Sequence, residues 1–162
     1  MINKIKKDIF QLFFHEFGSC VYVLKLDNKN ILIDTSSPEK IDAFYKNIRI
    51  ALEFAKTRNV IINLEPHGEF SGTGKKIISI LERIDHPNIG LNYDTANVMF
   101  YAGVRPEEDI KNVLGKITHL HLKDHIGGKG VYNFPALGDG DVNFFLIFSL
   151  LRDSQYQGPI TV

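Results

Sequence analysis

Apolar runs of strand length alternate with amphipathic helical segments along most of this 162-residue chain. Apolar residues recur at helical spacing in residues 39–58, 74–86, 106–114 and 143–153, and the intervening apolar runs cover residues 60–65, 89–94, 117–123 and 159–162. Strands that alternate with helices form parallel sheets, because each helix carries the chain back to the starting end of the next strand. The alternation therefore predicts an α/β fold with a parallel sheet, of the α/β-barrel or the doubly wound type.

The first 38 residues follow a different pattern. Two β-rich runs, residues 21–26 and 31–34, surround the turn-forming residues 27–30, which predicts a β-hairpin. Ser37 then supplies a helix N-cap, and Pro38 stands at the first helical position. We expect an N-terminal hairpin segment over residues 1–38 and an α/β domain over residues 39–162.

Composition narrows the class of protein. Lys and Arg (19) balance Asp and Glu (19), so the net charge is zero and no overall field attracts nucleic acid or an anionic membrane. The single cysteine, Cys20, cannot form an intramolecular disulfide, which excludes a disulfide-stapled secreted scaffold. No apolar run reaches the roughly 18–20 residues that cross a bilayer. These features predict a cytoplasmic protein with no nucleic-acid partner and no membrane partner.

Polar residues with metal-binding chemistry stand at the ends of three successive apolar runs. Glu65 ends the first run, Asp94 ends the second, and His119 and His121 lie in the third. The carboxyl ends of parallel strands meet at one edge of the sheet, where ligands bind. A Glu or Asp at such a place also commonly caps the next helix, and a pair of histidines on one strand face is often structural. Three consecutive strand ends together favour a site for Mn²⁺, Zn²⁺, Mg²⁺ or Co²⁺.

Residues 40–162 resemble the C-terminal half of the xylose-isomerase-like TIM barrels, the sugar isomerases and epimerases. The motifs that carry the resemblance are residues 63–68 (NLEPHG), 91–97 (LNYDTAN), 119–124 (HLHLKD), 134–144 (FPALGDGDVNF) and 156–162 (YQGPITV). The resemblance implies a partial TIM barrel of about four parallel βα units, which here is preceded by a β-hairpin and a helix.

The resemblance also implies roles for single residues. Glu65, Asp94 and His121 would bind the divalent metal, and Glu65 would also be one of two acid/base carboxylates. The substrate, a sugar or sugar phosphate, would lie against three further residues: His67, Asn97 and Lys123. The metal would polarise the carbonyl and hydroxyl of the sugar while the carboxylates move a proton between adjacent carbons.

The chain departs from the family pattern at both ends. The family's fourth ligand, a glutamate on the last strand, would follow Val162, where this sequence stops, and the first half of the barrel has no counterpart before Lys40. We therefore expect a truncated protein that is weakly active or inactive. Four strands cannot close a barrel, so we also expect two free sheet edges, an exposed apolar face, and a homodimer or larger assembly.

Two other functions compete with this interpretation. Residues 15–38 resemble the opening hairpin of a metallo-β-lactamase-fold hydrolase, and residues 118–128 look like its His-x-His-x-Asp-His motif. However, Asp124 and His125 lie one position too far from His119 for that motif, and no histidine follows His125. The second alternative is a non-catalytic half-barrel that serves as a binding or structural module. An apurinic endonuclease relative fits less well, because that branch uses more histidines.

Overall fold

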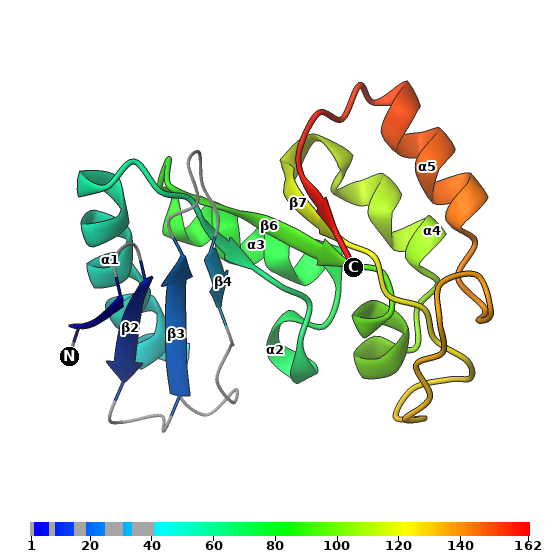
Figure 1. Cartoon of the computed structure of the whole chain (residues 1–162), viewed down its shortest axis with the longest axis horizontal. Coiled ribbons are helices and arrows are strands. Elements are labelled where there is room, and N and C mark those ends of the chain that lie inside the picture. The colour runs from blue at the N-terminus through cyan, green and yellow to red at the C-terminus, as the bar shows by residue number, and fades with distance from the viewer. Residues whose placement is uncertain (1, 7–8, 15–18, 25–30, 34–40) are drawn as a thin grey trace.

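Within the described residues, eight strands form one sheet in chain order (Figure 1). The computed structural model describes residues 2–6, 9–14, 19–24, 31–33 and 41–162, with side chains for residues 41, 42 and 44–162. The strands are β1 (Ile2–Lys6), β2 (Ile9–Phe14), β3 (Ser19–Leu24), β4 (Ile31–Ile33), β5 (Ile62–Leu64), β6 (Ile89–Asp94), β7 (Ile117–His121) and β8 (Ile160–Thr161).

The sheet has an antiparallel part and a parallel part. Strands β1 to β4 pair antiparallel, whereas β4 to β8 pair parallel. The predicted hairpin is confirmed as the β3–β4 pair, and the predicted α/β fold with about four parallel βα units is confirmed by the run from β4 to β8. Strands β1 and β2 were not predicted, and the predicted helix start at Ser37 and Pro38 lies outside the described residues.

Helices follow the parallel strands, and local signals fix several of their ends. They are α1 (Ile41–Thr57), α2 (Gly68–Ser71), α3 (Gly74–Ile84), the π-helical turn η2 (Val98–Ala102), α4 (Pro106–Asp109), two 3₁₀ turns η3 (Ile110–Asn112) and η4 (Leu114–Lys116), and α5 (Phe144–Asp153). The Thr73 side chain caps α3 by accepting a hydrogen bond from the Lys76 amide at 3.2 Å, and Asn143 caps α5 in the same way. None of the described helices is long and apolar enough to span a membrane.

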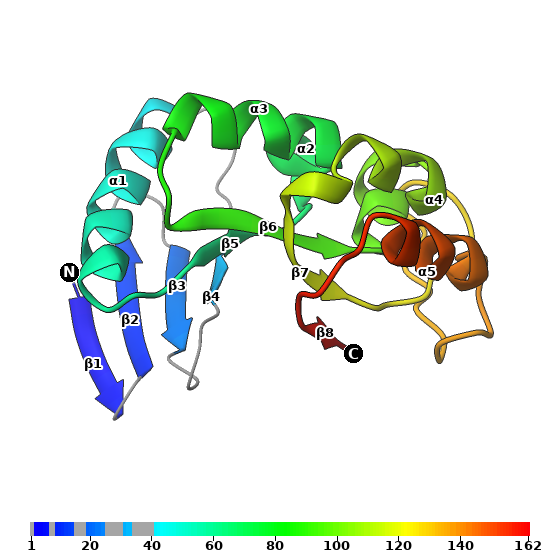
Figure 2. The same ribbon diagram turned by 90° about the horizontal axis from the view of Figure 1, so that it is seen from above.

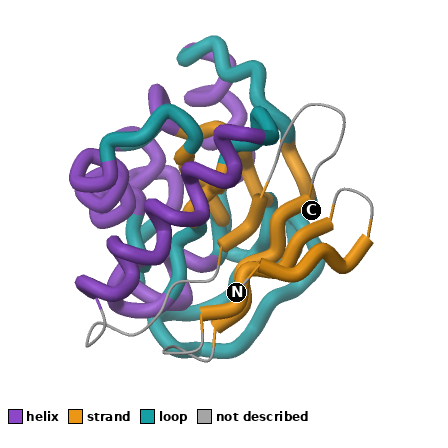
Figure 3. The backbone as a smooth tube through the Cα atoms, turned by 90° about the vertical axis from the view of Figure 1, so that its left-hand side faces the viewer, coloured by secondary structure: helices purple, strands orange, loops and turns teal. Residues whose placement is uncertain are grey.

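The described helices lie on the convex side of the curved sheet, and none of them covers its concave side (Figures 2 and 3). Leu64, Leu91 and Tyr93 point toward the helices and belong to the buried hydrophobic core. Alternate residues of the same strands, such as Asn63 and Asn92, are polar and point to the concave side. The predicted exposed apolar face is therefore wrong for β5 and β6, because the concave side of these strands is built from polar residues.

A one-residue bulge in β7 sets which of its side chains reach the concave side. Leu91 pairs with Ile117, but the next residue of β6, Asn92, pairs with His119, so Thr118 is extra. Ile117 packs into the core, while Thr118 donates a hydrogen bond to the Asn63 side chain on the concave side. The bulge thus turns His119 to the concave side although Ile117, two residues earlier, faces the helices.

Candidate metal centre

Glu65, Asp94 and His121 meet at the carboxyl ends of β5, β6 and β7. The His121 Nδ1 atom lies 3.1 Å from Glu65 Oε1 and 3.2 Å from Asp94 Oδ2. One potential ligand atom from each residue lies within 4.8 Å of the others, and this is the sole group of three such residues found in the described part of the chain. The structure therefore brings together all three residues that the sequence predicted as metal ligands.

Asp94 serves as a turn cap and a potential ligand at the same time. Its Oδ1 accepts hydrogen bonds from the Ala96 and Asn97 amides, both at 2.8 Å, and so starts the turn that leads into η2. Its Oδ2 is buried, and its contact with His121 is its one polar contact among the described residues. The two interpretations that the sequence left open, a cap and a ligand, are thus compatible, because each uses a different oxygen.

Asn92 fixes the position of Glu65. The Asn92 amide donates a hydrogen bond to Glu65 Oε1 at 2.8 Å, and both side chains are buried. Groups that hold a ligand in this way commonly tune a metal site. Asn92 was not among the predicted site residues, although its position two residues before Asp94 places it on the same strand face.

The charge of His121 depends on the two carboxylates that it faces. Its contacts with Asp94 and Glu65 raise the pKa of His121 from 6.5 to about 9, against the opposing effect of burial. Burial, together with the nearby His121, lowers the pKa of His119, whose Nε2 lies 3.1 Å from Thr161 Oγ1. At neutral pH, His121 is therefore an imidazolium between two carboxylates.

The donor set fits a divalent ion. Two carboxylates and one imidazole are borderline to hard ligands, which suit Mg²⁺, Mn²⁺, Zn²⁺ and Co²⁺. A cation among these atoms would replace the proton on His121 Nδ1 and supply the positive charge that the two carboxylates attract. The geometry thus supports metal binding by residues that already face one point.

The three residues predicted to face the substrate take part in two contacts, one between His67 and Tyr101 and one between Lys123 and Asn97. His67 Nε2 lies 2.9 Å from the hydroxyl of Tyr101, and the two rings are 4.3 Å apart. Lys123 donates a hydrogen bond to Asn97 Oδ1 at 3.3 Å, and its ammonium lies 4.0 Å from the centre of the Phe134 ring. Tyr101 and Phe134 were not predicted. That these residues face a substrate stays a prediction.

A long irregular segment follows β7 and is held by one carboxylate. Asp124 is fully buried, and it accepts hydrogen bonds from the amides of His125, Gly138, Gly140 and Val142 at 2.9–3.1 Å. We call residues 125–142 the β7–α5 loop. Long loops with defined structure in compact domains commonly serve function.

His125 is also committed to this loop. Its Nε2 lies 2.6 Å from the Val131 carbonyl, and its ring packs against Phe100 and Phe134. Asp124 and His125 thus form hydrogen bonds within the loop and do not join His121. This agrees with their spacing in the sequence, which does not fit the hydrolase motif.

Comparisons with known proteins give a consistent match. Residues 13–162 match the family model described as "Xylose isomerase-like TIM barrel". An inosose dehydratase from Clostridium tetani is 26% identical over 126 residues, which cover 68% of this chain and 42% of that protein.

Two solved structures share the fold. A xylose isomerase-like TIM barrel protein from Mycobacterium smegmatis, solved in complex with magnesium, gives a TM-score of 0.66 at 24% identity over 80% of this chain and 45% of that chain. A D-allulose 3-epimerase from Methylomonas, solved with D-allulose, gives 0.64 at 22% identity over 79% of this chain and 43% of that chain. The chain thus spans less than half the length of each of these relatives.

Proposed function

Because this chain belongs to the xylose isomerase-like TIM barrel family, we propose that it carries the metal and proton-transfer centre of an enzyme that acts on a sugar or sugar phosphate. Glu65, Asp94 and His121 bind one divalent ion, and Glu65 exchanges a proton with the substrate. The observation that carries this proposal is the convergence of these three side chains at the ends of three neighbouring strands.

The proposed chemistry begins with the removal of a proton from the carbon next to a carbonyl. The bound ion would polarise that carbonyl and so make the neighbouring proton more acidic. Asn92 donates a hydrogen bond to one oxygen of Glu65, which orients the carboxylate that we assign as the general base. Isomerisation, epimerisation and dehydration of such a sugar can each start from this step, so the proposal covers the reactions named for both the dehydratase and the epimerase relatives.

The neighbouring pairs would orient the substrate. His67 and its partner Tyr101 offer hydrogen-bonding groups on one side, and the Lys123 ammonium, shared with Asn97, offers a positive charge on another. Lys123 forms no ion pair among the described residues, so its charge is available to a substrate oxygen. Phe134 against this ammonium restricts the directions from which a substrate can approach.

Metal binding is the first test. Titration of the purified protein with Mn²⁺, followed by the loss of the free-ion electron paramagnetic resonance signal, should show one site. Asp94→Asn and His121→Gln should each weaken that binding at least about 10- to 100-fold. His125→Gln is the matched control, because His125 is buried nearby but bonds only within its loop. Unchanged Mn²⁺ binding in both ligand variants would refute the proposal.

The second test measures proton exchange, the first step that isomerisation, epimerisation and dehydration would share. The Mn²⁺-loaded protein should introduce solvent deuterium next to the carbonyl of a ketose such as D-allulose or of an inosose, measured by NMR in D₂O. Glu65→Gln should slow the exchange by about 10²–10⁴-fold, the usual loss for a general base. Exchange that proceeds equally fast in Glu65→Gln would exclude Glu65 as the base.

A further inference from the structure

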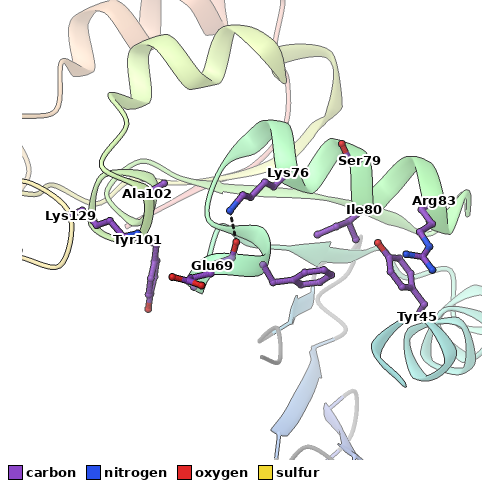
Figure 4. Close-up of a pocket in the computed structure, with 11 residues that line it drawn as sticks. Tyr45, Glu69, Lys76, Ser79, Ile80, Arg83, Tyr101, Ala102 and Lys129 are labelled. Carbon is purple, nitrogen blue, oxygen red and sulfur yellow. Dashed lines mark hydrogen bonds between the residues drawn. The ribbon is translucent and has the colours of Figure 1, made fainter. Parts of the chain in front are cut away.

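A pocket of about 820 Å³ lies between α2, α3 and η2, with α1 at one end (Figure 4). We call it the α2–α3 pocket. Its volume falls within the range of roughly 300–1,000 Å³ that is common for small-molecule sites. None of Glu65, Asp94 and His121 lines it. It is therefore a separate candidate site.

Positive side chains outnumber negative ones around this pocket. Lys76, Arg83 and Lys129 line it, and Glu69 is the one carboxylate among the described residues that line it. Lys76 donates one hydrogen bond to the Glu69 carbonyl oxygen, which leaves two of its N–H groups for a ligand (Figure 4). Lys129 makes no hydrogen bond or ion pair within the part of the chain described by the structure. The excess of two positive charges favours an anionic ligand.

Aromatic rings line the pocket beside these charges. Tyr45 and Phe70 form an edge-to-face pair with ring centres 6.5 Å apart, and the Arg83 guanidinium lies 4.0 Å above the Tyr45 ring. Arg83 also pairs with Asp42 at 3.5 Å, but both side chains are largely exposed, so this pair is weak. The rings provide an apolar wall against which a carbon skeleton can pack.

Tyr101 links the pocket to the metal centre. Its ring lines the end of the pocket near Lys129 (Figure 4), whereas its hydroxyl contacts His67, two residues after Glu65. A ligand in the pocket would thus lie against a residue that also positions His67.

We propose that the α2–α3 pocket binds a small phosphate monoester, with the phosphate held by Lys76 and Lys129 and the organic group against Tyr45 and Phe70. The ligand is either a phosphorylated substrate that reaches the metal centre or a separate effector. In both cases the pocket recognises the same phosphate chemistry. Phosphate binding in the pocket does not depend on the function proposed for the metal centre, whereas the identity of the ligand as a substrate rests on that function.

Phenyl phosphate is a suitable probe, because it combines a phosphate monoester with a ring. Isothermal titration of the metal-free protein should show binding that is tighter for phenyl phosphate than for inorganic phosphate or phenol. Lys76→Gln and Lys129→Gln should each weaken binding by about 3- to 10-fold, and Glu69→Gln should tighten it by about 2- to 5-fold, since a like charge is removed. Lys75→Gln is the matched control, because Lys75 is an exposed neighbour of Lys76 that does not line the pocket.

The outcomes separate this proposal from its rivals. Equal weakening in Lys75→Gln, or no change in any variant, would mean non-specific charge attraction and would overturn the proposal. Loss of phenyl phosphate binding in Asp94→Asn would place the anion at the metal centre instead and would also overturn it. Binding that persists in Asp94→Asn supports the proposal even if that variant shows the metal assignment to be wrong. Competition by substrate-sized sugar phosphates only when Mn²⁺ is bound would identify a phosphorylated substrate, and competition without Mn²⁺ would identify an effector.

Discussion

Asp124 holds the β7–α5 loop, and replacing it should release that loop without unfolding the sheet. Each carboxylate oxygen accepts two amide hydrogen bonds, Oδ1 from His125 and Val142 and Oδ2 from Gly138 and Gly140. Asp124→Asn replaces one oxygen with an NH₂ group that cannot accept, so two amides lose their partner. A buried donor without a partner costs about 1–3 kcal/mol, and we expect a loss of about 2–4 kcal/mol for this variant, since the loop can relax partly.

Hydrogen exchange measures this local stability directly. A loss of that size should speed amide exchange in residues 125–142 by about 30- to 1,000-fold, because each 1.4 kcal/mol is a factor of ten. Exchange in β6 should change little. The same loop can be disturbed from the other side: a Cβ at Gly140 would lie 2.2 Å from Asp124 Oδ1, so Gly140→Ala should have a similar effect.

Gly128→Ala is the control, because a Cβ there meets nothing within 4 Å. Mn²⁺ binding should survive in Asp124→Asn, since the carboxylate does not contact the metal cluster, whereas orientation of Lys123 by Phe134 should be lost. Protection of residues 125–142 that is the same in Asp124→Asn and in the unaltered protein would refute the idea that this carboxylate organises the loop.

Three further outcomes follow from the site and the sheet. The contacts with Asp94 and Glu65 raise the pKa of His121 from 6.5 to about 9. In the metal-free protein, these contacts should therefore add to the free energy of unfolding in full below pH 6.5, and this stabilisation should be lost as the pH rises through about 9. The loss of stability is about 3 kcal/mol at most. It would be visible as a fall in the urea midpoint of the unaltered protein that His121→Gln does not show. An equal fall in both proteins would contradict the idea that His121 causes this pH dependence. Asn92→Ala should weaken Mn²⁺ binding by about 10- to 100-fold while Asn112→Ala leaves it unchanged, and equal affinities would show that Asn92 does not orient Glu65. Light scattering should show a dimer or larger species through the free edges at β1 and β8, whereas a monodisperse monomer would exclude that prediction.

Alternation of apolar segments was sufficient to predict the parallel half of the fold. Strand β6 has the predicted bounds, because residues 89–94 are flanked by clear breaks in the apolar pattern. The convergence of Glu65, Asp94 and His121 was predictable for a geometric reason, since the ends of neighbouring parallel strands share one edge of the sheet. Their role as metal ligands remains a prediction.

The supporting residues carried weaker signals. Asn92 could have been found from its spacing to Asp94, but Tyr101 lies on a π-helical turn, which has no periodic pattern to reveal it. The role of Asp124 depends on amides 14–18 residues away, and those contacts exist only after the loop has folded. Strands β1 and β2 were not predicted, because only residues 21–26 and 31–34 were interpreted as strands in the N-terminal region.

The bulge at Thr118 has a consequence for how insertions and deletions act on this protein. In a regular strand, a change of one residue reverses every side chain beyond it, so the core and the metal centre would fail together. Here the extra residue, Thr118, lies between the part of β7 that packs into the core and the part that carries His121. The stretch before it can keep Ile117 in the hydrophobic core, while the stretch after it is aligned independently by pairing with Asn92 and Asp94. Deletion of Thr118 would therefore leave a regular strand in which both Ile117 and His121 keep their partners on β6, whereas deletion of one residue from the unbulged middle of β6 would reverse Asp94 or the core residues that precede it. The three strands of one metal centre thus differ in their tolerance to a shift in length.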